Sequence, residues 1–215
     1  MPTLSQENYL KALWHLAGEG KVTLQRLAKQ LGISPASALA MVRKLAAAKL
    51  VTYSRNAGIR LTAAGRRAAI EVVRRHRLWE VFLHDKLGYR WDEVHRIAEE
   101  LEHIAIPDLA DRLDVFLGKP AYDPHGDPIP QKDGSVPPRP EQVLSQQEPG
   151  RYRIAGLKST ADELLRQLEY LDLALGQIIE LRERLPFDGT LVLRIGRRTQ
   201  HIGMQIGDQL LVLPA

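Results

Sequence analysis

The chain has 215 residues, of which 44% are hydrophobic, and a formal net charge of +4. It has no cysteine, which excludes disulfides and thiolate metal sites and leaves oxygen and imidazole nitrogen as the available metal ligands. No stretch approaches the ~18 uncharged apolar residues of a membrane span. The N-terminus has no basic region leading into an apolar one, so we expect a cytoplasmic protein without a signal peptide.

Charge is distributed unevenly along the chain. Residues 1–75 hold 13 lysines and arginines but three acidic residues, whereas residues 76–125 hold six basic and 11 acidic residues. A basic segment followed by an acidic one is typical of a phosphate-binding module beside a cation-binding module. Ordinary variation in surface charge is the alternative.

The first 62 residues predict a winged helix-turn-helix. Apolar residues at helical spacing predict a helix over residues 4–16. Thr23 and Ser34 are suited to cap two short helices on either side of Gly32. Two apolar runs, 50–53 and 59–61, predict a β-hairpin with a basic tip.

The second short helix is the candidate recognition helix for the major groove of DNA, and the hairpin is the candidate phosphate contact. Serine and alanine make few bidentate contacts with bases, so we expect readout through thymine methyl groups and DNA shape. A winged helix that contacts only proteins is the alternative. The candidate DNA-contacting residues are Ser34, Ala36, Ser37, Ala40, Lys44, Arg55 and Arg60.

The acidic centre places imidazoles and carboxylates on single helical faces. A helix over 63–87 would align His76, Glu80 and His84, because these residues are four apart. A second helix, starting near residue 91, would align four more such residues on one face: His95, Glu99, Glu102 and His103. Two rigid helices presenting such side chains can build a metal coordination shell.

Two other interpretations of this centre remain open on spacing alone. The glutamates can form a solvated acidic face without a metal ion. The same spacing is also compatible with a metal-dependent hydrolase, which needs an open coordination position and a nucleophilic water.

The remaining chain predicts a dimerisation helix, a linker and a small β domain. A helix over 107–117 presents Leu109, Leu113 and Phe116 as candidate interface residues. The proline-rich segment 119–149 predicts an extended linker, in which His125 is interpreted as structural. Beyond it, a strand over 151–157 and a helix capped by Ser159 or Thr160 precede further strands, predicted over 178–181, 190–195, 201–206 and 209–213.

Several motifs together resemble one family. They are the opening Ser5-Gln6-Glu7-Asn8-Tyr9-Leu10, Arg75-His76-Arg77-Leu78-Trp79-Glu80, Val94-His95, Glu99-x-x-Glu102-His103, and Asp123 to Pro130. The combination resembles the diphtheria-toxin-repressor family of metal-dependent regulators, in the long form with a C-terminal SH3-like (FeoA-type) domain. The resemblance is strong to Pro130 and weaker after it.

The resemblance implies two neighbouring metal sites and a function. Asn8, Glu99, Glu102 and His103 would form the regulatory site. His76, Glu80 and His95 would form a second site, for which Asp162 and Glu163 are further possible ligands. Metal would fix the angle of the winged helix, so that a homodimer binds operator DNA and represses metal-uptake genes. This is not an enzymatic function.

The chain departs from the family pattern at two positions. Asn8 offers a neutral carbonyl oxygen where manganese-type members commonly have aspartate, and Lys11 replaces their glutamate. We therefore expect two separated sites rather than a compact two-ion cluster. Glu99 in place of a sulfur ligand favours Mn(II), with Fe(II) second.

The predicted fold class is mostly α with a small β domain. The predicted divisions are a winged helix-turn-helix (1–62), a helical metal-binding and dimerisation domain (63–118), a proline-rich linker (119–149) and an SH3-like barrel (150–215). A winged-helix regulator that no longer senses metal is the second functional hypothesis.

Overall fold

The N-terminal part is a winged helix, as predicted. The structure is a computed structural model that describes residues 2–18 and 20–215; the side chain of Asp162 lies outside the described part. Three helices and an antiparallel hairpin follow one another: α1 (Leu4–Ala17), α2 (Leu24–Gln30), α3 (Pro35–Ala47), β1 (Val51–Ser54) and β2 (Gly58–Leu61).

Local sequence explains these boundaries. Thr3, Thr23 and Ser34 each accept a hydrogen bond from the first turn of the helix they precede, and Pro35 opens α3. The inward side chains then meet in one core, which includes Leu10, Leu13, Leu27, Val42, Leu45 and Ile59. Because α1 contributes Leu10 and Leu13 to this core, α1 and the recognition helix α3 belong to the same packed unit.

The central part consists of α4 (Ala63–Leu87), α5 (Trp91–Leu101) and α6 (Leu109–Phe116). The Gly65 N–H donates to Thr62 Oγ1 at the start of α4, and Gly88 ends the helix in the left-handed conformation with φ 72°. The third helix begins at Leu109 rather than at Pro107, because Asp108 has φ 64° and interrupts the helical conformation.

The proline-rich segment is not an extended linker, contrary to the prediction. Ile129, Val143 and Leu144 are buried, and Leu144–Gln146 form a short 3-10 helix. The Arg77 guanidinium of α4 donates to a carbonyl of this segment, that of Pro128. Proline removes backbone donors and so prevents regular structure, but it does not prevent an irregular segment from burying its apolar side chains.

The C-terminal part is a five-stranded antiparallel sheet in the order β6-β5-β4-β3-β7. Its elements are β3 (Gly150–Leu157), α7 (Asp162–Tyr170), β4 (Ile178–Arg184), β5 (Leu191–Ile195), β6 (Arg198–Ile202), α8 (Met204–Gly207) and β7 (Leu210–Pro214). Two details differ from the prediction. Ala161, not Ser159 or Thr160, precedes α7, and the strand expected over 201–206 ends at Ile202 and is followed by α8.

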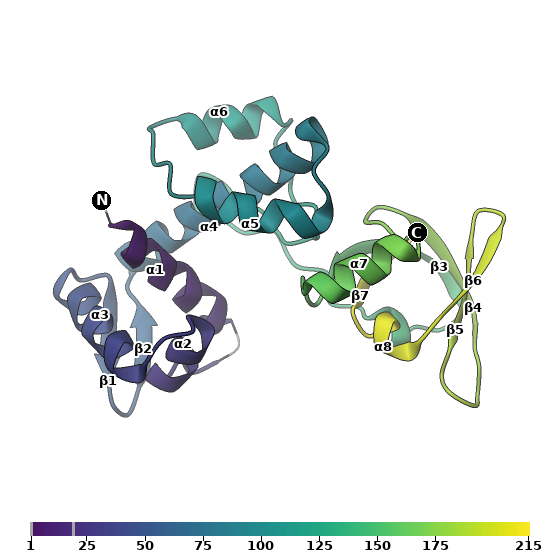
Figure 1. The fold of residues 1–215 in the computed structure, drawn as a ribbon, viewed down its shortest axis with the longest axis horizontal. Helices are drawn as coiled ribbons and strands as arrows, with labels where there is room; N and C mark the ends of the chain where they lie inside the picture. The colour runs from purple at the N-terminus through teal and green to yellow at the C-terminus, as the bar shows by residue number, and fades with distance from the viewer. Residues whose placement is uncertain (1, 19) are drawn as a thin grey trace.

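The three parts follow one another in space as they do in sequence (Figure 1). The winged helix lies at one end, α4 leads from it into the central helices, and the C-terminal sheet lies at the other end. Contacts between α5 and α7, including the ion pair of Arg90 with Glu169, join the last two parts. The fold class is mostly α with a small β domain, as predicted. Within the described ranges, no helix is long and apolar enough to cross a membrane.

Candidate metal centre

Three of the predicted ligands meet around one carboxylate oxygen. Glu80 Oε1 lies 3.0 Å from His76 Nε2, one turn back on α4, and 3.2 Å from His95 Nδ1 on α5. The two imidazole nitrogens are 3.1 Å apart. His76 and Glu80 are buried, whereas the side chain of His95 is half exposed. The arrangement is a buried carboxylate that faces two imidazoles and is open to solvent on the His95 side.

Two further residues join this carboxylate from the proline-rich segment. Glu80, Asp123 and His125 are all buried and offer ligand atoms that lie within 4.8 Å of one another. His125 Nδ1 is 3.7 Å from Glu80 Oε1. Sequence reasoning interpreted His125 as structural and did not single out Asp123. The signal that could have found them was the run from Asp123 to Pro130, which was quoted only for its family resemblance.

Two of the residues assigned to the regulatory site, Glu99 and Glu102, adjoin this cluster. Glu99 joins His76 and His95 in a second group whose ligand atoms lie within 4.8 Å of one another. Glu102 is fully buried at the end of α5, and its Oε1 is 3.7 Å from His103 Nε2. Glu102 Oε2 also lies 2.6 Å from His76 Nδ1, so Glu102 connects the α4–α5 cluster with the region around His103.

α1 reaches the central helices through side chains on one face. Glu7 Oε1 accepts from Arg75 at 2.8 Å, and Glu7 Oε2 lies 2.7 Å from His103 Nδ1. Lys11 Nζ donates to Glu99 Oε1 at 2.8 Å and to Glu102 Oε2 at 2.5 Å. Sequence reasoning missed Glu7, although its position four residues before Lys11 puts both on the same face of α1.

Electrostatics in the cluster are dominated by Glu80. Burial tends to raise the pKa of Glu80, but His76 and hydrogen bonds from its imidazole neighbours outweigh burial and hold this pKa well below its usual value. Burial opposes the charged form of His76 and of His125, yet their carboxylate neighbours raise both pKa values to about 9. Burial, and then the charge of Glu80, raise the pKa of Asp123 to about 7. A metal ion would therefore have to displace protons from these imidazoles.

The donor atoms fit a divalent cation. They are carboxylate oxygens, imidazole nitrogens and one amide oxygen, a set suited to manganese and iron ions. Among the described side chains, Asn8 Oδ1 and Glu102 Oε1 are buried atoms without a hydrogen-bond partner. Buried oxygens are normally paired, so both atoms are able to accept a cation. Lys11 does not fit as a ligand, because an ammonium has no lone pair to donate.

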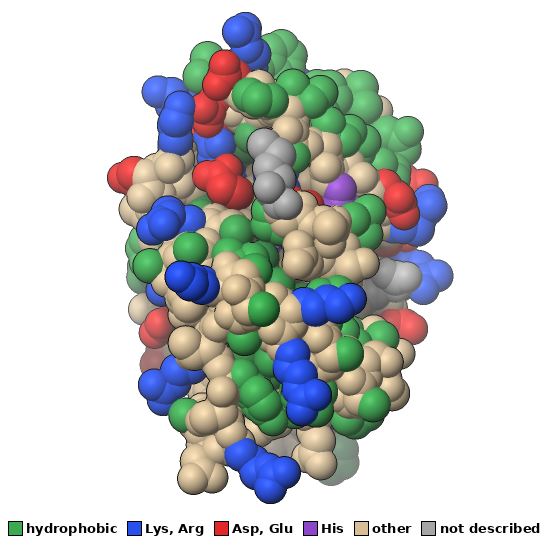
Figure 2. All heavy atoms as spheres, turned by 90° about the vertical axis from the view of Figure 1, so that its left-hand side faces the viewer, with side chains coloured by type: hydrophobic (Ala, Val, Ile, Leu, Met, Phe, Trp, Pro, Cys, Tyr) green, Lys and Arg blue, Asp and Glu red, His purple; other side chains and the backbone are tan. Residues whose placement is uncertain are grey.

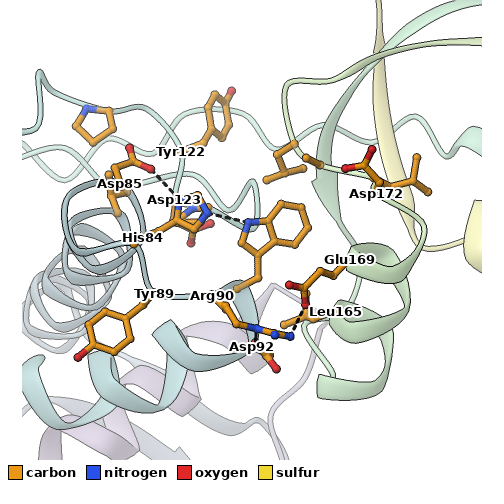
Figure 3. A pocket seen from close by; sticks show the side chains of 18 residues that line it. His84, Asp85, Tyr89, Arg90, Asp92, Tyr122, Asp123, Leu165, Glu169 and Asp172 are labelled. Atoms are coloured by element: carbon orange, nitrogen blue, oxygen red, sulfur yellow. Dashed lines mark hydrogen bonds and ion pairs between the residues drawn. The ribbon is translucent and has the colours of Figure 1, made fainter. Parts of the chain in front are cut away.

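Other candidates lie away from the cluster. His84 accepts a hydrogen bond from the Trp91 indole at 3.0 Å and lines a cleft of about 570 Å³ between α4, α5 and α7 (Figure 3). Glu163 is exposed and belongs to neither ligand group of the described residues. The side chain of Asp162, the other possible ligand, falls outside the described residues.

The predicted DNA-contacting residues share an exposed surface on the winged helix. All seven are exposed: Ser34, Ala36, Ser37, Ala40, Lys44, Arg55 and Arg60. Ala38, Val42 and Leu45 are the residues of α3 that face the core. Figure 2 shows this end of the molecule, with Lys and Arg side chains spread over the whole face and most of the Asp and Glu in its upper half. The candidate DNA-contacting residues are therefore accessible to a partner molecule.

Three family models match the chain. Residues 1–59 match the N-terminal DNA-binding domain of iron-dependent repressors, residues 62–131 their metal-binding and dimerisation domain, and residues 143–214 the FeoA domain.

Individual relatives carry names of the same kind. The iron-dependent repressor IdeR of Mycobacterium leprae is 37% identical over 125 residues, which are 58% of this chain and 54% of that protein. The match thus spans about half the length of this curated relative. The diphtheria toxin repressor of Corynebacterium jeikeium is 29% identical over 183 residues, 83% of this chain and 76% of that protein.

Solved structures match over the whole length. A manganese-dependent transcriptional repressor in complex with manganese is 37% identical with a TM-score of 0.81, covering 98% of this chain and 100% of that chain. ScaR with bound Zn²⁺ is 32% identical with a TM-score of 0.76, and both chains are covered in full. The chain belongs to the diphtheria-toxin-repressor family of metal-dependent transcriptional regulators, in the form that ends in a FeoA domain.

Proposed function

We propose that this protein is a metal-activated repressor that binds operator DNA as a homodimer and controls metal-uptake genes. The observation that carries the proposal is the convergence of His76, His95 and His125 on the buried Glu80 carboxylate, in a chain whose basic winged helix is joined to that cluster by α1. The regulated genes are inferred from family membership alone.

Two sets of side chains are proposed to hold metal. His76, Glu80 and His95 form the first set, and Asp123 and His125 lie beside it. Asn8, Glu99, Glu102 and His103 form the second, and the buried, unpartnered oxygens of Asn8 and Glu102 support it. When bound, a divalent ion would add positive charge among these carboxylates.

α1 is proposed to link metal occupancy to DNA binding. Asn8 is on α1, and Leu10 and Leu13 of the same helix are buried in the winged-helix core. A contact from Asn8 to the central helices therefore restricts the orientation of α3. Two recognition helices held at a fixed spacing can enter successive major grooves, about 34 Å apart.

Mn(II) is proposed as the activating ion, with Fe(II) second. The described ligands are oxygen and nitrogen, and the chain has no thiolate to favour softer ions. Relatives named for iron and for manganese both match, so the names do not decide between the ions. Titration calorimetry of the chelator-stripped protein with each ion under anaerobic conditions should give the higher affinity for Mn(II).

One titration tests the function as a whole. A duplex is first selected from a random library by the manganese-loaded protein, and its affinity is then measured with Mn(II) and with chelator at several salt concentrations. We expect tighter binding with Mn(II) and a fall in affinity as salt rises, since phosphate contacts release counterions. Equal affinity with Mn(II) and chelator would contradict metal activation, and affinity indifferent to salt would contradict the DNA interface.

The presence of Lys11 in the cluster favours one alternative, a winged-helix regulator that no longer responds to metal. That alternative predicts no saturable Mn(II) binding in the same calorimetric experiment.

A further inference from the structure

A lysine ammonium lies among the side chains proposed to hold metal. Lys11 Nζ is 2.8 Å from Glu99 Oε1, 2.5 Å from Glu102 Oε2 and 3.2 Å from His76 Nδ1. The lysine is only 9% exposed, and its three partners belong to α4 and to the end of α5. The Lys11 ammonium thus contacts three side chains that are also proposed metal ligands.

This burial is electrostatically balanced. An ammonium removed from water is unfavourable unless opposite charges compensate it. Glu99 and Glu102 supply two carboxylates within hydrogen-bond distance, and the side chain of Glu102 is fully buried. Burial tends to raise the pKa of Glu99, but the charge of Lys11 outweighs it and lowers that pKa. The lysine and the two glutamates therefore stabilise one another without a metal ion.

The contact also crosses between two parts of the fold. Lys11 is on α1, which belongs to the winged helix, whereas Glu99 and Glu102 belong to the central helices. Glu7, one turn earlier on α1, makes separate contacts with Arg75 and His103. Lys11 adds the link from α1 to the carboxylates of α5. A link of this kind restricts the same motion that a metal ion bound by Asn8 would restrict.

We propose that the Lys11 ammonium is a built-in cation that joins α1 to α5 before metal binds and thereby sets how strongly DNA binding depends on metal. It takes the position between Glu99 Oε1 and Glu102 Oε2 that an ion bridging those two oxygens would need, and leaves the other oxygens of both carboxylates to metal. Metal then strengthens an existing connection instead of creating it. The inference rests on the proposed metal response of this cluster.

Three variants test the proposal through DNA affinity, measured with chelator and with saturating Mn(II). Lys11→Met keeps an unbranched side chain, one heavy atom shorter, but removes its charge. We expect it to weaken binding in chelator at least about fivefold, the low end of measured couplings between sites, and to lose less with Mn(II). Lys11→Glu supplies a ligand and repels its neighbours, so its affinity should depend on Mn(II) most steeply. Lys158→Met removes an exposed charge from the C-terminal domain and should leave both affinities unchanged.

The outcomes separate this inference from the proposed function. If the wild-type protein responds to Mn(II) but Lys11→Met binds DNA like the wild type in both conditions, the inference is wrong and the function stands. If the wild type ignores Mn(II) while Lys11→Glu responds to it, the metal-activated function is wrong and the role of Lys11 stands.

A second measurement uses the wild-type protein and so does not depend on the folding of any variant. Crystals grown with Mn(II) give an anomalous difference map that locates manganese. We expect manganese at the oxygens that Lys11 does not contact, such as the unpartnered Glu102 Oε1, with Lys11 still between Glu99 Oε1 and Glu102 Oε2. Manganese bridging these two carboxylates, with Lys11 displaced, would overturn the proposal.

Discussion

Glu80 is the residue on which the candidate metal centre converges. One of its oxygens lies within hydrogen-bond distance of His76 and His95 and 3.7 Å from His125. These imidazoles come from α4, from α5 and from the proline-rich segment. Removing the charge of Glu80 would leave His76 and His125 buried with less compensation, and it would remove the anionic ligand that they share.

We expect Glu80→Gln to lower Mn(II) affinity at least about tenfold, because even partners that only orient a metal ligand contribute 10- to 100-fold. Calorimetry of the stripped protein measures this loss. Glu183→Gln is the matched control, since Glu183 is an exposed residue of β4 in the C-terminal domain. Equal Mn(II) affinity in Glu80→Gln and the wild type would remove Glu80 from the site. Circular dichroism separates a lost ligand from a lost fold.

At Asn8, a substitution can add a negative charge to the centre instead of removing one. Its Oδ1 is a buried atom without a hydrogen-bond partner among the described residues, and a carboxylate there would add one negative charge toward any ion. We expect Asn8→Asp to raise Mn(II) affinity several-fold, and to lower the thermal stability of the metal-free protein because a charged carboxylate would be buried there without a partner. Unchanged Mn(II) affinity would show that α1 supplies no ligand.

At the scale of elements, the irregular segment from Asp123 to Ile129 contributes side chains to the centre just as the helices α4 and α5 do. It carries two potential ligands, and its backbone is held closely against the C-terminal sheet: the Leu157 N–H of β3 donates to the His125 carbonyl at 3.1 Å. Gly126 allows this approach. It has φ 82°, and a Cβ there would lie 2.4 Å from the Ala155 carbonyl oxygen.

This packing distinguishes two glycines of the same segment. Gly126 and Gly134 both have positive φ, but nothing lies within 4 Å of a Cβ built on Gly134. Alanine at either position costs about 1–3 kcal/mol of backbone strain. Only Gly126→Ala should add about 1–3 kcal/mol for the clash and weaken Mn(II) binding. Urea unfolding and calorimetry on both variants check this. Similar losses in the two would mean that the close approach does not matter.

Periodicity explains which elements the sequence could predict. The helical spacing of Leu10, Leu13, Val42 and Leu45 predicted α1 and α3, and alignment on one face predicted that His76 and Glu80 would meet. Asp123 and His125 lie in a segment without periodicity, so no local pattern could place them beside Glu80. The contact of Lys11 with Glu99 depends on how α1 crosses α5, which is a tertiary property.

For the whole molecule, the C-terminal domain contacts the elements that carry the candidate ligands. The described part of α7 places none of its side chains in either ligand group. Instead, β3 packs against the segment that carries His125, and Glu169 pairs with Arg90 at the start of α5. We infer that the FeoA domain supports the position of these ligand-bearing elements, which is how it can affect metal binding without supplying a ligand.

Dimerisation also concerns the whole molecule. One winged helix contacts a single half-site of DNA, so the central domains of a dimer must hold two winged helices at the spacing of two half-sites. Of the interface residues predicted on α6, Phe116 is 64% exposed and Leu113 is buried at 9%. Its neighbour Val115 is also 64% exposed, and the Phe116 ring lies against Phe82 and Lys86. A twofold interface uses the same patch of both subunits. A contact made by the Phe116 ring would therefore occur twice in each dimer, and one substitution would remove both copies.

We therefore expect Phe116→Asp to raise the dimer dissociation constant at least about tenfold, as substitution of a buried interface aromatic typically does, and to weaken operator binding in parallel. Sedimentation velocity measures the first effect and the DNA titration the second. Phe187→Asp is a stringent control, because Phe187 is 99% exposed in the C-terminal domain and an exposed phenylalanine alone does not make an interface. If Phe116→Asp stays dimeric at the wild-type concentration, the twofold contact must use another face of the central domain.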